Sequence, residues 1–171
     1  MVDVRRSWVQ ITLLTLAVIG IGVSIYLTAV HYQAAPLVCS NTGLIDCARV
    51  LSSAYSVVPG TKIPITIPGM GWFVVVGALA ALAAFRGQER RDLRLVMLAW
   101  TALGMLTVFY LVYTELVRLH TICIWCTSLH IIIFVMFLIA VTQLQQTQEP
   151  EEEALDEEEE EEATALKTAH D

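Results

Sequence analysis

Four cysteines are the residues of this 171-residue chain whose type and spacing point to chemistry, and they form two local pairs. Cys123 and Cys126 are three positions apart, whereas seven residues separate Cys39 from Cys47. Residues three apart share a helix face, so the sulfur atoms of Cys123 and Cys126 can bond to each other. Among the possible pairings, the spacing favours one bond within each pair. The pattern indicates thiol–disulfide chemistry.

Cys123 and Cys126 stand where a short polar break gives way to an apolar run. Residues 124–144 are mostly apolar and are long enough to span a bilayer as a helix. We expect Cys123 near the first turn of that helix and Cys126 one turn deeper. A helix N-terminus favours the thiolate, which makes these cysteines better nucleophiles than free ones. The sequence therefore predicts a redox site that lies partly within the membrane.

The composition is that of an integral membrane protein, since 56% of the residues are hydrophobic and the mean hydropathy is +0.65. The net charge of -7 arises from residues 149–171, which hold 12 of the 17 acidic residues. Residues 1–148 carry five acids against nine lysines and arginines, which gives no support to nucleic-acid binding. We predict a transmembrane domain over residues 1–148 and a disordered acidic tail over residues 149–171.

Four apolar runs predict an all-α membrane protein with a bundle of four transmembrane helices, at residues 8–30, about 69–85, about 95–117 and 124–144. The first run is longer than the apolar region of a signal peptide, and no clear cleavage site follows it. Residues 31–68 form a loop in which Asp46 is the expected N-cap of a short helix over residues 47–54. Prolines at 64 and 68 prevent residues 62–68 from continuing a helix, so we expect this segment to lie at the membrane surface as a lid.

Charged residues set the expected orientation in the membrane. Arg5 and Arg6 precede the first span, and residues 86–94 between the second and third spans hold four arginines. Arginine-rich loops stay in the cytoplasm, which places both termini inside and both cysteine pairs on the extracytoplasmic side. Disulfides persist in oxidising compartments outside the cytoplasm, so the charge pattern and the cysteine pattern agree.

Metal binding explains the cysteines less well than redox chemistry does. Four cysteines can bind zinc, but Cys39 and Cys47 lack the short spacing of a zinc knuckle, and the other pair begins a membrane helix. A haem is disfavoured because there is no Cys-x-x-Cys-His and the histidines lie at different depths. The loop pair is either a structural staple or a shuttle that takes electrons from a soluble thiol protein and passes them to the other pair.

Two polar residues near the fourth helix have a functional interpretation beside a structural one. His130 lies four residues after Cys126, on the same helix face and one turn deeper. It either packs against a neighbouring helix or acts on the redox site. Glu115 and Arg118 are three apart, which predicts an ion pair at the membrane surface; the alternative is that Glu115 is a proton source.

Three motifs follow one another along the chain: Cys39-x7-Cys47, then Ala48-Arg49-Val50-Leu51-Ser52-Ser53, then Cys123-Ile-Trp-Cys126 at the start of the last helix. In this combination the chain resembles the vitamin K epoxide reductase homologues. The resemblance covers about residues 8–145, with the same order of four spans. The combination is much more specific than either cysteine pair alone.

The resemblance implies a four-helix bundle around a quinone pocket, and prokaryotic members of the family reoxidise thioredoxin-like partners. By this resemblance Cys126 faces the quinone, Cys123 exchanges with the loop, and Cys47 is the loop cysteine that reaches Cys123. Cys39 is then the cysteine exposed to the partner. Ser53 matches a Ser/Thr position of the family that is associated with the organisation of the short helix.

The chain departs from the family pattern in three places. His130 stands where animal members have a tyrosine, and no individual quinone ligand is assigned within the proline-rich residues 63–68. Many bacterial members carry a fused thioredoxin-like domain, whereas here an acidic tail follows the last helix. We therefore expect the partner to be a separate thioredoxin-like protein outside the cytoplasm.

The expected function is that of a membrane thiol–disulfide oxidoreductase, which takes electrons from protein dithiols and reduces a membrane quinone of the menaquinone, ubiquinone or phylloquinone class. The expected site has no metal and places Cys126 and His130 against the quinone; its catalytic residues are Cys39, Cys47, Ser53, Cys123 and Cys126. Two alternatives remain: a dedicated vitamin K quinone or epoxide reductase, and a non-catalytic membrane scaffold with two structural disulfides.

Overall fold

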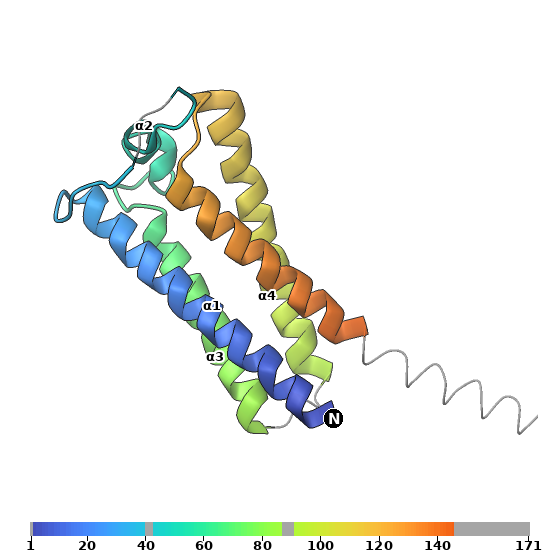
Figure 1. Cartoon of the computed structure of the whole chain (residues 1–171). Coiled ribbons are helices and arrows are strands. Elements are labelled where there is room, and N and C mark those ends of the chain that lie inside the picture. Colours follow the sequence, from blue (N-terminus) through green and yellow to red (C-terminus); the bar gives the residue numbers. More distant parts are fainter. Residues whose placement is uncertain (1, 40–42, 87–90, 146–171) are drawn as a thin grey trace, which may run out of the picture.

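Four apolar runs of the sequence become four long helices that lie side by side (Figure 1). The computed structural model describes residues 2–39, 43–86 and 91–145. Each long helix contains a segment that is apolar and long enough to cross a membrane, which confirms the expected all-α fold with four spans. These helices are α1 (Val2–His31), α3 (Thr66–Arg86), α4 (Arg91–Tyr113) with its π-helical continuation η2 (Thr114–Leu119), and the C-terminal helix (Ile124–Gln145).

The connections place both cysteine segments at the same end of the bundle. The loop between α1 and α3 carries the short helix α2 (Cys47–Leu51) and the 3₁₀ turn η1 (Ala54–Ser56), and Figure 1 shows it at the end where η2 turns into the C-terminal helix. The first turn of α1 and the last turn of α3 lie at the opposite end. The antiparallel order of the helices therefore brings two stretches that are far apart in sequence into one region.

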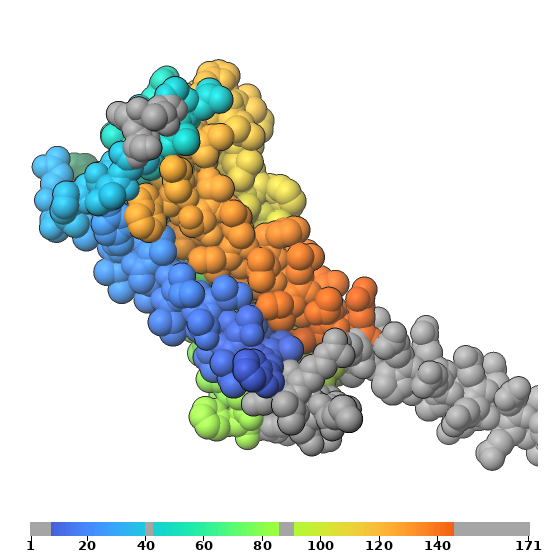
Figure 2. Space-filling view, in the orientation of Figure 1, coloured from blue at the N-terminus to red at the C-terminus, as the bar shows by residue number. Residues whose placement is uncertain are grey.

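The outer surface of the bundle is apolar. Val18, Phe85, Leu106 and Phe109 are among many large hydrophobic side chains that are exposed, and Phe85 is 89% exposed. Such a surface is unfavourable in water but suits the lipid of a bilayer. In the space-filling view the loop after α1 rests on the beginning of the C-terminal helix and covers that end of the bundle (Figure 2).

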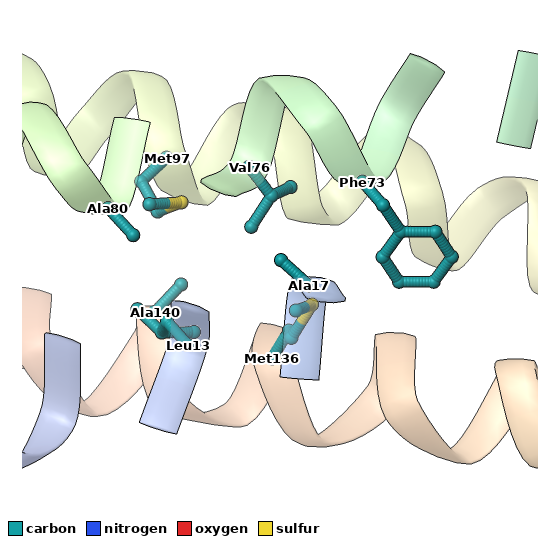
Figure 3. Close-up of a cluster of buried hydrophobic side chains, with 8 residues drawn as sticks. All are labelled: Leu13, Ala17, Phe73, Val76, Ala80, Met97, Met136 and Ala140. Carbon is teal, nitrogen blue, oxygen red and sulfur yellow. The ribbon is translucent and has the colours of Figure 1, made fainter. Parts of the chain in front are cut away.

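Apolar side chains from all four helices fill the interior of the bundle. Figure 3 shows this cluster, in which Phe73 and Val76 of α3 face Ala17 of α1 and Met136 of the C-terminal helix. Gly20 allows the close approach of α1 and α3, because a Cβ atom at this position would overlap the ring of Phe73. The remaining members of the cluster are Leu13, Ala80, Met97 and Ala140.

The second span begins earlier than expected. α3 starts at Thr66 rather than near residue 69, and Pro68 lies within its first turn. Proline is tolerated there because the first N–H groups of a helix have no partner within the helix. The expected lid is therefore shorter, because of residues 62–68 only 62–65 remain outside the helix. The chain before it forms a turn in which Val58 N donates to Ile63 O at 2.9 Å.

The short helix of the loop is also shorter than expected. Asp46 is its N-cap, as predicted, and Oδ1 accepts a hydrogen bond from the backbone N–H of Arg49 at 2.9 Å. The helix ends at Leu51 rather than at residue 54, because Ser53 adopts an extended conformation while its hydroxyl donates to the carbonyl of Val50 at 2.7 Å. Serine side chains that bond to nearby backbone groups commonly end helices in this way.

The third span is longer than expected. It begins at Arg91 rather than near residue 95 and, through η2, reaches Leu119. Arg94 is buried within it, and its Nη1 donates to the carbonyl of Gln143 at 3.0 Å, which joins α4 to the end of the C-terminal helix. The middle of the arginine-rich loop and the predicted acidic tail, residues 149–171, lie outside the described residues.

Candidate redox site

The loop cysteines form a disulfide, as their spacing predicted. Cys39 and Cys47 are bonded with a Cα–Cα distance of 6.2 Å. Cys47 is the first residue of α2 and is fully buried, whereas Cys39 lies outside regular secondary structure and is partly exposed. A reagent or partner that approaches from outside the bundle therefore meets the sulfur of Cys39 before that of Cys47.

Cys123 and Cys126 are reduced and in contact at the start of the C-terminal helix. The helix begins at Ile124, so Cys123 occupies the position just before the helix rather than its first turn. Its sulfur accepts hydrogen bonds from the backbone N–H of Cys126 at 3.3 Å and from the Cys126 thiol at 2.7 Å. The hydrogen bond from the Cys126 thiol lowers the pKa of Cys123, while burial opposes this effect. The arrangement favours a thiolate on Cys123 and a thiol on Cys126.

The loop is bound directly to the segment that carries the second pair. Ile45 and Ile122 form a parallel bridge, in which Ile122 N donates to Leu44 O at 2.8 Å and Asp46 N donates to Ile122 O at 3.2 Å. The indole N–H of Trp125 donates to the carbonyl of Val38 at 2.8 Å, close to Cys39 in the sequence. These bonds hold the loop across the beginning of the C-terminal helix.

Both cysteine pairs belong to one hydrophobic cluster. Cys47 and Cys123 are completely buried in it, together with Val50 of α2. Cys39 and Cys126 lie at its margin, as do Leu37, Leu51, Leu119 and Trp125. The arrangement makes Cys47 and Cys123 the two cysteines that share the interior of the cluster.

A cavity of about 680 Å³ lies below this cluster, between the loop, α1, α3, α4 and the C-terminal helix. Cys126 and His130 both line it, so the two residues share a face as the spacing of four residues predicted. Much of the remaining wall is apolar or aromatic and includes Trp72 of α3 and Trp100 of α4. The indole N–H of each tryptophan donates to the backbone carbonyl of the other, at 3.1 and 3.4 Å.

Two polar side chains face this cavity without a protein partner. His130 is buried, and within the described ranges no hydrogen bond reaches its imidazole. Ser24 of α1 is fully buried, and its hydroxyl has no hydrogen-bond partner in the part of the chain that the structure describes. A buried polar group normally finds a partner, so these side chains are suited to a polar ligand within an apolar cavity.

A second and smaller chamber adjoins the first one at Cys126 and His130. It measures about 60 Å³ and is lined by Ser53, the serine singled out by the sequence, and by Glu115. Ser53 is therefore near the cysteine site, but its hydroxyl donates to the carbonyl of Val50 and stabilises the end of α2. The structure gives this serine a structural contact rather than a contact with a cysteine.

Glu115 is the residue whose surroundings the sequence did not predict. We expected an ion pair with Arg118 at the membrane surface, but Glu115 is only 6% exposed and Arg118 points outward. The expected pair is wrong because both residues belong to η2, where the wider π-helical turn moves positions three apart onto different faces. The Glu115 carboxyl instead faces the backbone N–H of Cys123.

Four membrane helices, two cysteine pairs at one end and an apolar cavity beneath them define a membrane-embedded thiol redox protein. The model of the vitamin K epoxide reductase family matches residues 11–141, which is most of the chain. The chain therefore belongs to the vitamin K epoxide reductase family. A search of curated proteins found no match.

Membership of the family agrees with the geometry of the site. The chain is an integral membrane protein of a family of oxidoreductases that use quinones. The large cavity fits such a group, because its volume is that of a small-molecule site and its wall combines apolar side chains with the unpartnered His130 and Ser24. When bound, a quinone would supply the acceptor for the two electrons of a dithiol.

Proposed function

We propose that the protein takes electrons from the dithiols of a separate thioredoxin-like protein and reduces a membrane quinone, so that it supports disulfide-bond formation. The observation that carries this proposal is the position of the two cysteine pairs. Cys47 and Cys123 share one buried cluster, and Cys126 lies between this cluster and the large cavity. Electrons therefore have a continuous route from the partly exposed Cys39 to a ligand in the membrane.

The first step is thiol–disulfide exchange at the loop. A partner thiolate attacks the sulfur of Cys39, which is the more exposed sulfur of the loop disulfide, and Cys47 leaves as a thiolate. A second partner thiolate resolves the mixed disulfide, so the partner leaves oxidised and the loop pair is reduced. The cycle then needs an acceptor for the two electrons on Cys39 and Cys47.

The second step transfers these electrons across the hydrophobic cluster. Cys47 attacks Cys123 when Cys123 and Cys126 form a disulfide, and Cys39 then attacks Cys47 to restore the loop disulfide. Cys123 and Cys126 are left as dithiols, which is the combination of states found in this structure. Cys126 and His130 face the cavity, where His130 would donate a hydrogen bond to a quinone carbonyl as it gains electron density.

The test uses purified full-length protein in lipid nanodiscs, supplied with a reduced thioredoxin-like protein and, in separate samples, menaquinone, ubiquinone or phylloquinone. We expect quinol formation and stoichiometric oxidation of the dithiol protein, and neither with Cys123→Ser. Vitamin K epoxide in a further sample distinguishes a dedicated epoxide reductase. If no sample is reduced while both disulfides persist in excess dithiol, the protein is a structural scaffold and the proposal is wrong.

The proposed orientation places both termini in the cytoplasm and both cysteine pairs outside it. The position of both pairs at one end of the bundle supports this proposal, and the arginines of residues 86–94 supply the direction. An impermeant thiol reagent added to intact cells after mild reduction should label Cys39. Labelling that appears only after lysis would reverse the orientation.

A further inference from the structure

The small chamber beside Cys126 is more polar than its neighbour. Its wall includes Ser53 and Tyr55 from the loop, His31 from α1, Glu115 from η2 and His130 from the C-terminal helix. At about 60 Å³ it has room for a few water molecules, which need about 10–15 Å³ each. Because Cys126 and His130 also line the large cavity, the chamber joins a set of titratable side chains to the place where a quinone would lie.

A π-helical turn brings the side chain of Glu115 close to Cys123 and Cys126. The π-helical turn η2 directs its side chain inward, and the backbone carbonyl of Glu115 accepts a hydrogen bond from Thr121 N at 3.1 Å. Its carboxyl faces the backbone N–H of Cys123, and Glu115 lines the same chamber as Cys126. π-Helical turns are frequent at functional sites, and this one places a carboxyl beside the reacting sulfurs.

No cation neutralises this buried carboxyl in the described part of the chain. Arg118, the nearest basic residue in the sequence, is exposed on the outer side of the same turn. Burial of a carboxylate without a cation is costly, and a bound proton removes this cost. The other titratable groups around the chamber are His31 of α1, Tyr55 of η1, and Cys126 and His130 of the C-terminal helix.

We propose that Glu115 holds the proton that Cys123 gives up and delivers it through the polar chamber to the quinone. This inference rests on the proposed function. A proton source was one interpretation of Glu115 from its place in the sequence, and what is new is the cysteine that supplies the proton and the chamber through which it reaches the quinone. The carboxyl is the group that can change its protonation next to Cys123 while remaining connected to the large cavity.

The step is balanced in atoms and electrons. Before oxidation, Cys123 is a thiolate, Cys126 is a thiol and Glu115 carries a proton. Formation of the bond between the two sulfurs breaks the S–H bond of Cys126 and releases two electrons. The proton from Cys126 and the proton from Glu115 form the two O–H bonds of the quinol, and Glu115 remains as a carboxylate until Cys123 is next reduced.

The decisive variant is Glu115→Gln, which keeps an oxygen that can accept the N–H of Cys123 but cannot carry a proton. We expect the oxidation of the dithiol by quinone to slow by about a hundredfold in a single turnover. Glu115→Asp should restore part of this rate, since it restores a carboxyl. Arg118→Gln is the matched control, because it removes a charge from the same turn on the exposed face and should leave the rate unchanged.

A second measurement does not depend on quinone. Infrared difference spectra of the quinone-free protein, recorded as a disulfide reagent oxidises Cys123 and Cys126, should show loss of the C=O band of a protonated carboxyl. The band should shift in deuterium oxide, persist in Arg118→Gln and be absent in Glu115→Gln. A wild-type spectrum without this band, or a Glu115→Gln variant that reduces quinone at the wild-type rate, would overturn the proposal. Failure of the wild type to reduce any quinone would instead overturn the proposed function.

Discussion

Cys39 and Cys47 are carried by a loop, whereas Cys123 and Cys126 are carried by the beginning of a helix that crosses the membrane. The loop pair is held in place by a short parallel bridge and by the hydrogen bond between Trp125 and Val38. The helical pair is fixed by the helix itself, since the sulfur of Cys123 accepts the N–H of Cys126. The loop can separate from the bundle by breaking a few bonds, but the helical pair cannot move without unfolding a helix end.

This difference suits two kinds of exchange. In the proposed reaction Cys39 meets a protein partner and Cys47 reaches Cys123, and both steps need a loop that can move. In the same proposal Cys126 meets a small ligand inside the membrane, where a fixed position beside the cavity is an advantage. We therefore expect variants to separate into those that affect the loop and those that affect the cavity.

The largest effect is expected when one cysteine of each pair is replaced. The double variant Cys39→Ser and Cys126→Ser leaves Cys47 and Cys123 without their resolving thiols, so a bond between them should accumulate and turnover should stop. Mass spectrometry of the alkylated, digested protein detects this cross-link. If the variant folds and inserts but the cross-link is absent, the loop pair is a staple and the comparison between a mobile and a fixed pair fails.

His130→Phe tests the cavity side of the comparison. Phenylalanine keeps the volume and apolarity of the side chain but removes the donor that faces the cavity. We expect quinone reduction to slow by about tenfold to a thousandfold, because the donor acts on charge that develops during the reaction. Exchange between Cys47 and Cys123 should be nearly unchanged. Stopped-flow absorbance of the quinone, together with gel-shift assays of the thiols, measures the two steps separately; an unchanged quinone step would make His130 a packing residue.

Trp125→Phe is the matched variant on the loop side. It removes the indole N–H that donates to Val38 but keeps an aromatic ring against Tyr26, whose centroid is 4.9 Å away. Loss of one hydrogen bond of about 0.5–1.5 kcal/mol should loosen the loop and slow exchange between the pairs by about twofold to tenfold. Quinone reduction from a chemically reduced Cys123 and Cys126 should remain at the wild-type rate. If quinone reduction slowed and exchange between the cysteine pairs stayed at the wild-type rate, Trp125 would act on the cavity instead of the loop.

The smallest effect is expected from deletion of residues 149–171. The deletion removes neither cysteine pair and none of the four spans, so quinone-dependent turnover should be retained within experimental error. The measurement is the same nanodisc assay, normalised to inserted protein. Loss of activity in a correctly inserted truncation would give the acidic tail a part in the reaction and extend the comparison to a third region.

The sequence was most informative where structure is local. Uninterrupted apolar runs predicted the four spans, and Asp46 predicted the N-cap of α2, because both depend on residues close together in the chain. The spacing of Cys126 and His130 predicted a shared face for the same reason. The contacts between Ile45 and Ile122 could not be predicted, since they join segments that only the completed fold brings together.

Glu115 shows a second kind of limit. Its distance of three residues from Arg118 predicts an ion pair only if the helix is an α-helix. The change to a π-helical turn at Thr114 has no recognisable signal in the sequence, and within this turn Glu115 is buried while Arg118 is exposed. The one available signal was an acidic residue within an apolar run, which marks a functional candidate but does not tell where its side chain points.

The sulfur of Cys123 has a consequence for the order of the backbone. It reacts, but it also takes the place of an N-cap side chain, because it accepts the N–H of the residue three positions later. When this sulfur joins a disulfide it becomes a weaker acceptor, so the helix end loses part of the roughly 0.5–2 kcal/mol that an N-cap contributes. The amide of Cys126 should then exchange with deuterium faster in the oxidised protein than in the reduced one. Oxidation of Cys123 should thus loosen the first turn of the C-terminal helix, where the loop between α1 and α3 is bound.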